Sequence, residues 1–265
     1  MTVVQWLNSL RVTHFAINQL GLRRVLSAAL DRFPIGRLLP SGVRYRCRYL
    51  DSVTLAEEIF SQRSYARAVP STVRTFVDLG CNVGQFVAFV ADVTGRRDLR
   101  GLAIDADPDM VAETQWVVDV NGLSSITALQ GLVGAPSAAV EQKDFFLHPC
   151  KIKSSAYALD EPGQPHKGDW KKTRVPTIDL EATWRARIGD DVRCDLLKVD
   201  IEGSEADFIT EDNPFLRRVD AVVVEVHKWV VDPAVIDARL RANGFAKVTD
   251  LWVTEAFAIA HYARA

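Results

Sequence analysis

The pattern of apolar and polar positions changes at about residue 72. From there on, apolar β-rich runs alternate with stretches whose apolar residues recur at helical spacing. Strands followed by helices predict a mostly parallel sheet that helices cover on both faces. The predicted strands lie at 73–79, 100–105, 125–134, 144–148, 194–200 and 220–227, and the predicted helices begin near Val83, Pro108, Ser204 and Pro233.

The last part of this pattern differs, because Ala246–Trp252 and Glu255–Tyr262 are two strand-like runs joined by a short break. They predict a hairpin that completes the sheet in antiparallel orientation. The segment 149–172 is polar and rich in glycine, proline and lysine, which predicts a long loop. Long loops in compact domains are usually functional or disordered.

The N-terminal part follows another pattern. Residues 1 to about 40 show helical spacing that Pro34 and Pro40 break. Val43–Leu50 alternates like an edge strand or a hairpin arm, and Leu55–Tyr65 is helical again. The predicted units are an N-terminal helical or lid extension with a short β segment, residues 1–70, and an α/β domain, residues 71–265.

Composition and charge narrow the class of protein. The chain has 265 residues, 48% of them hydrophobic, which is enough to bury a full core. The net charge of −2 gives no basic excess that could hold a phosphate backbone, so we do not expect nucleic acid as a partner. The four cysteines are widely spaced and form no CxxC pair, which disfavours a zinc site or a disulfide framework. With no signal peptide and no membrane-spanning stretch in the sequence, we expect a cytoplasmic protein.

The first candidate motif is FVDLGCNVGQ, in which a strand runs into a turn with Gly80 and Gly84 and then into a helix. Glycine lets the backbone approach a ligand closely. The spacing does not fit GxGxxG, so a dinucleotide cradle is not indicated. The carboxylate of Asp78 suits a cationic ligand such as S-adenosylmethionine, which carries an amine and a sulfonium. The alternative is an ordinary glycine turn.

The second motif is GLAIDADP, whose Asp105 ends the next strand. An acid at this distance from the glycine turn can bind both hydroxyls of a ribose. Asp107 before Pro108 has the pattern of a helix N-cap, so we interpret Asp107 as structural and Asp105 as functional. Together the two motifs favour a nucleoside cofactor over a solvated loop acid.

The third motif, CDLLKVDIEGSE, places Lys198, Asp200 and Glu202 on one face of a strand end. Ionisable groups there are costly unless they are paired or functional. The alternative is a lysine–carboxylate network that ties the strand to the next helix. Glu205, in the first turn of that helix, is interpreted as favouring the helix dipole.

The fourth motif, AVVVEVHK, is a buried strand with Glu225 and His227 on one side of its carboxyl end. Histidine titrates near neutral pH and is the most common general base. A single histidine is more often structural, but this one shares its face with an acid beside another charged strand end. We therefore favour a functional role for the pair.

The segments DLGCNVGQF, AIDADP, VPTIDLEA, DLLKVDIEGSE and VVEVH together resemble the FkbM-type methyltransferases, over residues 42–262. The resemblance implies a Rossmann-like class I methyltransferase fold, α/β, with a mostly parallel seven-stranded sheet. It also implies contacts of Asp78, Gly80, Asn82 and Gly84 with the methionine part of S-adenosylmethionine, and of Asp105 with its ribose. Ala106 departs from the family pattern, which commonly has proline there. The predicted cofactor site comprises Asp78, Gly80, Cys81, Asn82, Gly84, Asp105, Ala106 and Asp200.

The predicted activity is methyl transfer to a hydroxyl oxygen, and the resemblance points to a sugar, a glycan or a secondary metabolite as acceptor. A base such as His227 or Asp200, or a metal ion, would help the hydroxyl lose its proton. His148 and His166 are next in line as bases. The predicted catalytic residues are His227, Asp200, Glu225 and Lys198, and Asp200, Glu225 and His227 would hold Mg²⁺ or Mn²⁺ if a metal takes part.

Residues 1–70 and the loop 149–172 are expected to roof the acceptor site, where Tyr157 and Trp170 could stack on a sugar. A dimerisation segment and a disordered loop are the alternative. Two other functions stay open at this point: an NAD-dependent oxidoreductase, which the missing GxGxxG disfavours, and a binding protein of the same fold that has lost catalysis. The sequence leaves the oligomeric state open, a homo-oligomer included.

Overall fold

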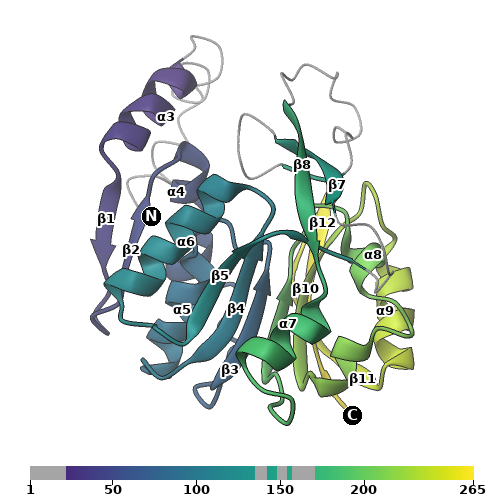
Figure 1. Ribbon diagram of the computed structural model, residues 1–265. Helices are drawn as coiled ribbons and strands as arrows, with labels where there is room; N and C mark the ends of the chain where they lie inside the picture. The colour runs from purple at the N-terminus through teal and green to yellow at the C-terminus, as the bar shows by residue number, and fades with distance from the viewer. Residues whose placement is uncertain (1–21, 135–141, 148–153, 157–170) are drawn as a thin grey trace.

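The computed structural model describes residues 22–134, 142–147, 154–156 and 171–265. Its centre is a seven-stranded sheet of order β11-β12-β10-β9-β3-β4-β5, in which β12 runs antiparallel to both of its neighbours and the other pairings are parallel (Figure 1). The predicted mostly parallel sheet with an antiparallel C-terminal hairpin is therefore confirmed. Its strands are β3 Thr75–Leu79, β4 Arg100–Asp105, β5 Ile126–Gln130, β9 Leu196–Val199, β10 Ala221–His227, β11 Phe245–Val253 and β12 Phe257–Arg264.

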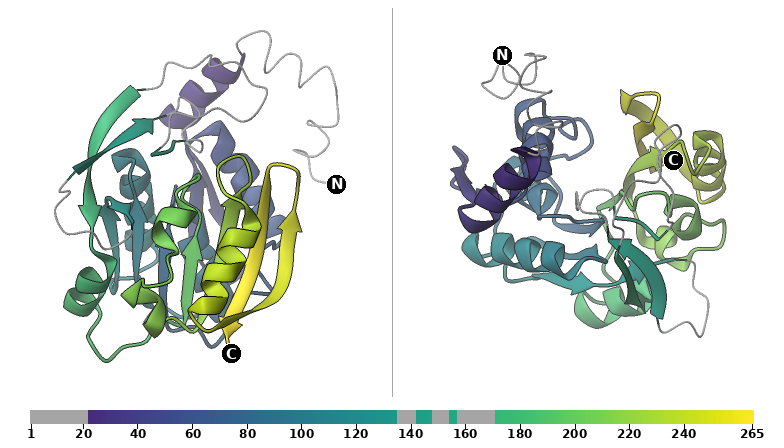
Figure 2. Two further views of the ribbon diagram at one scale, coloured as in Figure 1. Left: turned by 90° about the vertical axis from the view of Figure 1, so that its right-hand side faces the viewer. Right: turned by 90° about the horizontal axis from the view of Figure 1, so that it is seen from above.

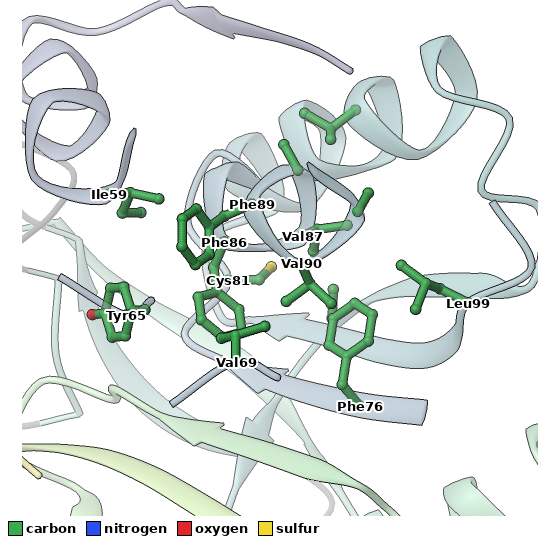
Figure 3. Packing of buried hydrophobic residues seen from close by; sticks show 14 of the residues in the cluster. Ile59, Tyr65, Val69, Phe76, Cys81, Phe86, Val87, Phe89, Val90 and Leu99 are labelled. Carbon is green, nitrogen blue, oxygen red and sulfur yellow. The ribbon is translucent and has the colours of Figure 1, made fainter. Parts of the chain in front are cut away.

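Neighbouring residues of the central strands belong to two different hydrophobic clusters, one on each face of the sheet. Phe76 packs in the first cluster and Val77 in the second, and Leu196 and Leu197 divide in the same way. Figure 3 shows the first cluster between β3 and the helix that follows it. The helices that cover the sheet are α5 Gln85–Thr94, α6 Pro108–Val120, α7 Leu180–Arg187, α8 Glu205–Phe208, α9 Pro233–Ala242 and a 3₁₀ segment, Pro214–Arg218.

Two of the predicted helix starts can be compared in detail. Asp107 caps α6, because its carboxylate accepts a hydrogen bond from the Asp109 N–H and Pro108 follows at the first helical position. The N-cap prediction is thus confirmed. The helix predicted from Ser204 is much shorter than the others, since α8 ends at Phe208.

The N-terminal part contains a hairpin rather than helix alone. Helix α3 (Leu22–Arg32) ends before Pro34, and Ile35–Leu38 forms strand β1, which pairs antiparallel with β2 (Arg44–Cys47). The predicted helix up to residue 40 is therefore wrong for 35–38, where Pro34 stops the helix and the chain turns back. Residues 1–21 lie outside the described residues. The next helix, α4 Leu50–Ala56, continues as a π-helical turn, η1 Glu57–Ser61.

This N-terminal hairpin belongs to the same core as the main sheet. Tyr45 is buried and its ring stacks on Phe60 at 4.2 Å between centroids, while Phe60 contacts Phe89 of α5 edge-on. Val43, Cys47, Ile59 and Tyr65 are buried in this cluster as well.

A second departure from the sequence pattern is a small sheet of order β6-β8-β7, with strands Leu132–Val133, Lys171–Ile178 and Gln142–Leu147. Lys171 and Lys172 were expected to end a loop, but they begin β8, which pairs with β7 over six residue positions. Strand β8 begins with two lysines and contains a proline, so its sequence lacks the apolar run or the alternation by which strands are predicted. Most of the predicted loop lies outside the described residues, including Tyr157 and Trp170.

No helix in the described part of the chain is long and apolar enough to cross a membrane. Cys47, Cys81 and Cys194 are buried and free, and Cys150 is not among the described residues.

Candidate functional site

A pocket opens where the carboxyl ends of β3, β4 and β9 meet, with about 640 Å³ of empty space, part of it open to solvent. Helices α3 and α4 and the strands β7 and β8 lie at this same end of the sheet (Figure 1, Figure 2). Ligands of open α/β sheets bind at such strand ends. The pocket is lined by Leu79, Gly80, Asn82, Ile104, Asp105, Ala106, Met110, Gly131, Leu132, Val133, Phe145, Ser154, Asp200, Ile201, Glu202 and Ser204.

The glycine turn after β3 packs directly on the segment that follows β9. Gly80 has a φ of +72°, and a Cβ placed there would lie 1.7 Å from the backbone oxygen of Asp200. The Asp200 N–H also donates to the Leu79 carbonyl at 3.1 Å. Only glycine permits this approach, so Gly80 keeps the first and third motifs in backbone contact. Gly84, with a φ of +74°, sits at the start of α5 against Thr114.

Asp105 holds two loops of the pocket together. One of its carboxylate oxygens accepts the Asn82 N–H and the other accepts the Asp107 N–H, both at 2.9 Å. Burial raises the pKa of Asp105 to about 6, although these two backbone hydrogen bonds act in the opposite direction. Asp105 therefore serves the fold as well as the pocket, whereas sequence analysis predicted a structural role for Asp107 only.

A buried ion-pair network lies under the glycine turn. Lys198 Nζ lies 3.2 Å from a carboxylate oxygen of Asp78 and 3.2 Å from one of Asp200, and it donates to the Gly80 carbonyl. Burial would lower the pKa of Lys198, but the two carboxylates outweigh it and raise the pKa above its usual value. Burial raises the pKa of Asp78 to about 6. A lysine–carboxylate network is thus present, but it ties β9 to β3 and its glycine turn and not to the next helix, and Lys198 does not line the pocket.

His227, at the end of β10, is buried among three glutamates. Its Nδ1 lies 2.9 Å from Glu205 Oε1, and its Nε2 lies 3.3 Å from Glu202 Oε2 and 3.8 Å from Glu225 Oε1. Burial alone would lower the pKa of His227, but the charges of Glu202 and Glu205 raise it well above its usual value. Burial, and then the charge of Asp200, raise the pKa of Glu225 well above its usual value.

Glu205 fixes the orientation of this imidazole. Its side chain is fully buried, and the carboxylate oxygen that faces His227 also accepts the Gly203 N–H at 3.0 Å. A carboxylate beside Nδ1 favours the proton on that nitrogen, which leaves Nε2 directed toward Glu202 and Glu225. The sequence offered only the helix-dipole interpretation of Glu205, because the turn that brings it under β10 is not visible in a strand–helix pattern.

The structure brings some predicted site residues together and separates others. Gly80, Asn82, Asp105, Ala106 and Asp200 line one pocket. The other members of the predicted cofactor set, Asp78, Cys81 and Gly84, lie behind it, and both Asp78 and Cys81 are buried.

The ligand atoms that could share a metal ion belong to Asp200, Glu202 and His227, within 4.8 Å of one another. The sequence had Glu225 in place of Glu202. Glu225 lies nearby, 3.8 Å from the His227 imidazole, but it does not line the pocket. Two other bases named from the sequence, His148 and His166, lie outside the described residues.

The N-terminal region adds two groups that the sequence did not single out. Burial, with the charge of Asp200, raises the pKa of Glu58 on η1 to about 7. Burial also raises the pKa of Tyr65, with further contributions from Glu225 and Asp200. Tyr65 packs edge-on against Phe86 at 5.2 Å (Figure 3). The charge of Asp200 thus affects the pKa of both groups, although neither residue belongs to one of the four motifs.

Comparison with known sequences gives two matches. The family model described as "Methyltransferase FkbM domain" matches residues 78–246, a span that begins within the first motif, at Asp78, and contains the other three. The protein named "Methyltransferase 1" of Beauveria bassiana (strain ARSEF 2860) is 25% identical over 201 residues, which cover 72% of this chain and 79% of that protein.

Two solved structures are also similar in fold. The N-terminal domain of EvdMO1 with SAH bound has a TM-score of 0.47 and 12% identity, covering 94% of this chain and 97% of that chain. Aeropyrum pernix fibrillarin in complex with S-adenosyl-L-methionine has a TM-score of 0.46 and 10% identity, covering 77% of this chain and 74% of that chain.

Proposed function

The chain belongs to the FkbM methyltransferase family, and on this basis we propose that it transfers a methyl group from S-adenosylmethionine to a hydroxyl oxygen of a small-molecule or glycan acceptor. One observation carries the proposal. A single pocket joins Gly80, Asn82 and Asp105 to Asp200 and Glu202, and Glu202 contacts His227. The pocket therefore offers a donor end and an acid-rich acceptor end side by side.

The donor end suits the cofactor chemically. Each oxygen of Asp105 accepts one backbone N–H and keeps a second lone pair, with which the carboxylate can accept a ribose hydroxyl. Asp200 and Glu202 give the pocket a negative potential, which favours the sulfonium and ammonium charges of S-adenosylmethionine. The predicted contacts of Gly80, Asn82 and Ala106 belong to this end.

In the proposed step, the hydroxyl oxygen attacks the methyl carbon and forms the new C–O bond. The C–S bond breaks, sulfur keeps the electron pair, and the cofactor leaves as S-adenosylhomocysteine. The hydroxyl proton passes to the cluster of Asp200, Glu225 and His227, in which His227 Nε2 lies 3.3 Å from Glu202 and 3.8 Å from Glu225. Much of the acceleration comes from holding oxygen and methyl carbon in line.

The acceptor class follows from the family and from the surroundings of the pocket. Sugars and hydroxylated secondary metabolites present several hydroxyls on a partly apolar frame. Phe145 and Ser154, from the small sheet and the segment after it, line the pocket and offer one apolar and one polar contact. These two contacts support the proposal that the small sheet and the segment after β7 cover the acceptor. We propose that the N-terminal residues cover it as well.

Two measurements test the proposed function. Titration calorimetry of the purified chain with S-adenosylhomocysteine should show saturable binding in the micromolar range or tighter. Radiolabelled methyl donor, offered with a panel of sugars, glycosides and hydroxylated metabolites, should label at least one acceptor in alkali-stable linkage, as expected for an ether. If the folded protein does not bind S-adenosylhomocysteine, the proposed function is wrong. If the label is found on an amine, the methyl acceptor is a nitrogen atom and not a hydroxyl oxygen.

A further inference from the structure

We propose that Asp200, Glu202 and His227 bind a divalent cation at the acceptor end of the pocket. Their ligand atoms lie within 4.8 Å of one another, and His227 Nε2 is 3.3 Å from Glu202 Oε2. Adjacent ligand atoms of an octahedral ion lie about 3 Å apart when each is about 2.1 Å from the metal. The His227–Glu202 spacing fits this value, and Asp200 completes the set by a small side-chain movement.

His227 is already oriented as a metal ligand. Histidines that bind metals usually donate their second ring N–H to a carboxylate or a carbonyl oxygen, which fixes the ring and makes the other nitrogen a better ligand. Glu205 supplies that carboxylate at 2.9 Å from Nδ1, from a fully buried position. A histidine with only a core-packing role has no need of a buried acid on one nitrogen and further acids on the other.

A second observation, independent of the acids, points to a ligand at this place. The Ser204 hydroxyl is buried, lines the same pocket as Asp200 and Glu202, and has no hydrogen-bond partner among the described residues. Buried hydroxyls are nearly always hydrogen-bonded. A metal-bound water or an acceptor hydroxyl would give Ser204 the partner that the protein does not.

Geometry selects Glu202 rather than Glu225 as the third ligand. Glu202 lines the pocket and lies closer to His227 Nε2, at 3.3 Å against 3.8 Å. Its backbone has a φ of +49°, which glutamate rarely adopts, and Ser155 Oγ holds it there by donating to its carbonyl at 2.6 Å. Strained residues of this kind gather at functional sites.

The donor set indicates the class of ion. Two carboxylates and one imidazole with open positions suit Mn²⁺, because carboxylates prefer hard ions whereas Mg²⁺ is usually bound by oxygen ligands and water alone. An ion here would lower the pKa of an acceptor hydroxyl bound to it. That role rests on the proposed function, but binding of the ion does not.

The test uses the full chain, freed of metal with EDTA, desalted and saturated with S-adenosylhomocysteine. Titration with Mn²⁺ followed by electron paramagnetic resonance should show a bound ion, and its pulsed spectrum should show coupling to an imidazole nitrogen. Glu202→Gln should weaken Mn²⁺ binding at least tenfold. The matched change Glu225→Gln should weaken it less than threefold. Glu205→Gln should weaken it by about 10–100-fold, the usual effect of losing a carboxylate behind a histidine ligand.

Calorimetry with S-adenosylhomocysteine and a thermal melt of each variant separate loss of fold from loss of the ion. Wild-type protein that binds S-adenosylhomocysteine but holds no Mn²⁺ overturns the inference and leaves the proposed function standing. Mn²⁺ binding without the imidazole signal, or equal losses in Glu202→Gln and Glu225→Gln, overturns the ligand set. Wild-type protein that binds Mn²⁺ but no S-adenosylhomocysteine overturns the proposed function and leaves the metal site standing.

Discussion

At the scale of single residues, Asp105 combines two tasks that sequence analysis would assign to different positions. It ends β4 in the pocket, and its two oxygens accept the backbone N–H groups of Asn82 and Asp107. Any substitution therefore changes the cofactor site and the loops around it together.

We expect Asp105→Ala to weaken S-adenosylhomocysteine binding by about 1–3 kcal/mol, or roughly 5–150-fold, the range of a charge-assisted hydrogen bond. The two backbone N–H groups also lose their acceptor, so the melting temperature should fall. Calorimetry and a thermal melt measure the two effects. Exposed Asp109, in the first turn of the helix α6 that follows, provides the control Asp109→Ala, which should keep the affinity. Unchanged affinity in Asp105→Ala would show that the ribose is bound elsewhere.

The pKa of Asp105, which burial raises to about 6, gives the affinity a pH dependence of defined sign. The ionised carboxylate can accept from both ribose hydroxyls, and the protonated form loses an acceptor. Binding of S-adenosylhomocysteine should thus be constant above about pH 7 and weaken as the pH falls through 6, by about tenfold per unit at most. Calorimetry between pH 5 and 8 measures this profile. Asp105→Asn should bind more weakly and flatten the slope, and an unchanged slope would assign the proton to another group.

His227→Ala should lower methyl transfer by about 10²–10⁴-fold and change S-adenosylhomocysteine affinity only a few-fold, because the imidazole lies at the acceptor end. Both the metal-free form and the metal-bound form predict this result. His261→Ala, on β12 and remote from the pocket lining, is the matched control and should keep the wild-type rate. Wild-type turnover in His227→Ala would place the base elsewhere, with His148 and His166 the next residues to replace.

Sequence reasoning found the strand ends but not every partner at them. Asp105, Asp200 and His227 follow apolar runs, and parallel strands bring such positions to one edge, so their proximity was predictable. The pairing of Glu205 with His227 was not, because it depends on a left-handed residue at Glu202 and on a helix of only four residues. Neither feature leaves a periodic signal.

Among the secondary-structure elements, the N-terminal hairpin is bound to helix α6 through the buried carboxylate of Glu113. Glu113 accepts hydrogen bonds from Arg46 through both oxygens, at 2.7 and 2.8 Å, and from Arg48 at 2.7 Å. The Arg46 guanidinium also lies 4.2 Å from the Trp116 ring centroid. A bidentate pair with a stacked arginine fixes orientation as well as distance.

Glu113→Gln should lower the free energy of unfolding by about 1–3 kcal/mol, less than a fully buried pair would lose, because both arginines are partly exposed. Urea unfolding followed by circular dichroism measures the loss. Asp119→Asn removes a charge from the exposed face of the same helix and should change stability by less than about 0.5 kcal/mol. Equal stability of the Glu113 variant and wild type would show that the charge of Glu113 contributes nothing to holding the hairpin.

Elements differ in how far the sequence predicts them. Strands β3, β4, β9 and β10 are mostly apolar and mostly buried, and they were located from the pattern. Strand β8 was not, since the small sheet leaves half of its residues exposed and the strand contains a proline. Strand β1 was missed for a related reason, because all four of its residues are exposed.

Across the fold, the pocket and the N-terminal segment before residue 40 are formed by different parts of the chain. The pocket lining falls between residues 79 and 204 and comes from the central sheet, the small sheet and the connections after the strands. Helix α3 and strand β1 contribute nothing to that lining. These two elements and the turn between them carry exposed apolar side chains at Val25, Phe33, Ile35 and Leu38.

Because none of residues 22–40 lines the pocket, deletion of residues 1–40 should leave S-adenosylhomocysteine affinity within about threefold. If the N-terminal residues cover the acceptor as proposed, the same deletion should reduce acceptor turnover. Strand β2 keeps its ion pairs with Glu113 and its buried Tyr45 and Cys47, so the core should survive the loss of β1. Calorimetry, a methyl-transfer assay and light scattering of the truncated chain measure the three consequences. Full turnover together with a smaller particle would show that the segment joins two copies of the chain instead of covering the acceptor.

The contact between Gly80 and the carbonyl of Asp200 has a consequence for motion. The turn after β3 and the segment after β9 touch through their backbones, without an intervening side chain. Thermal displacements of the two segments must then be correlated, since neither can move toward the other without overlap. If the methyl donor and the acceptor bind as proposed, we expect the main chain itself to limit fluctuations along the line from sulfur to acceptor oxygen.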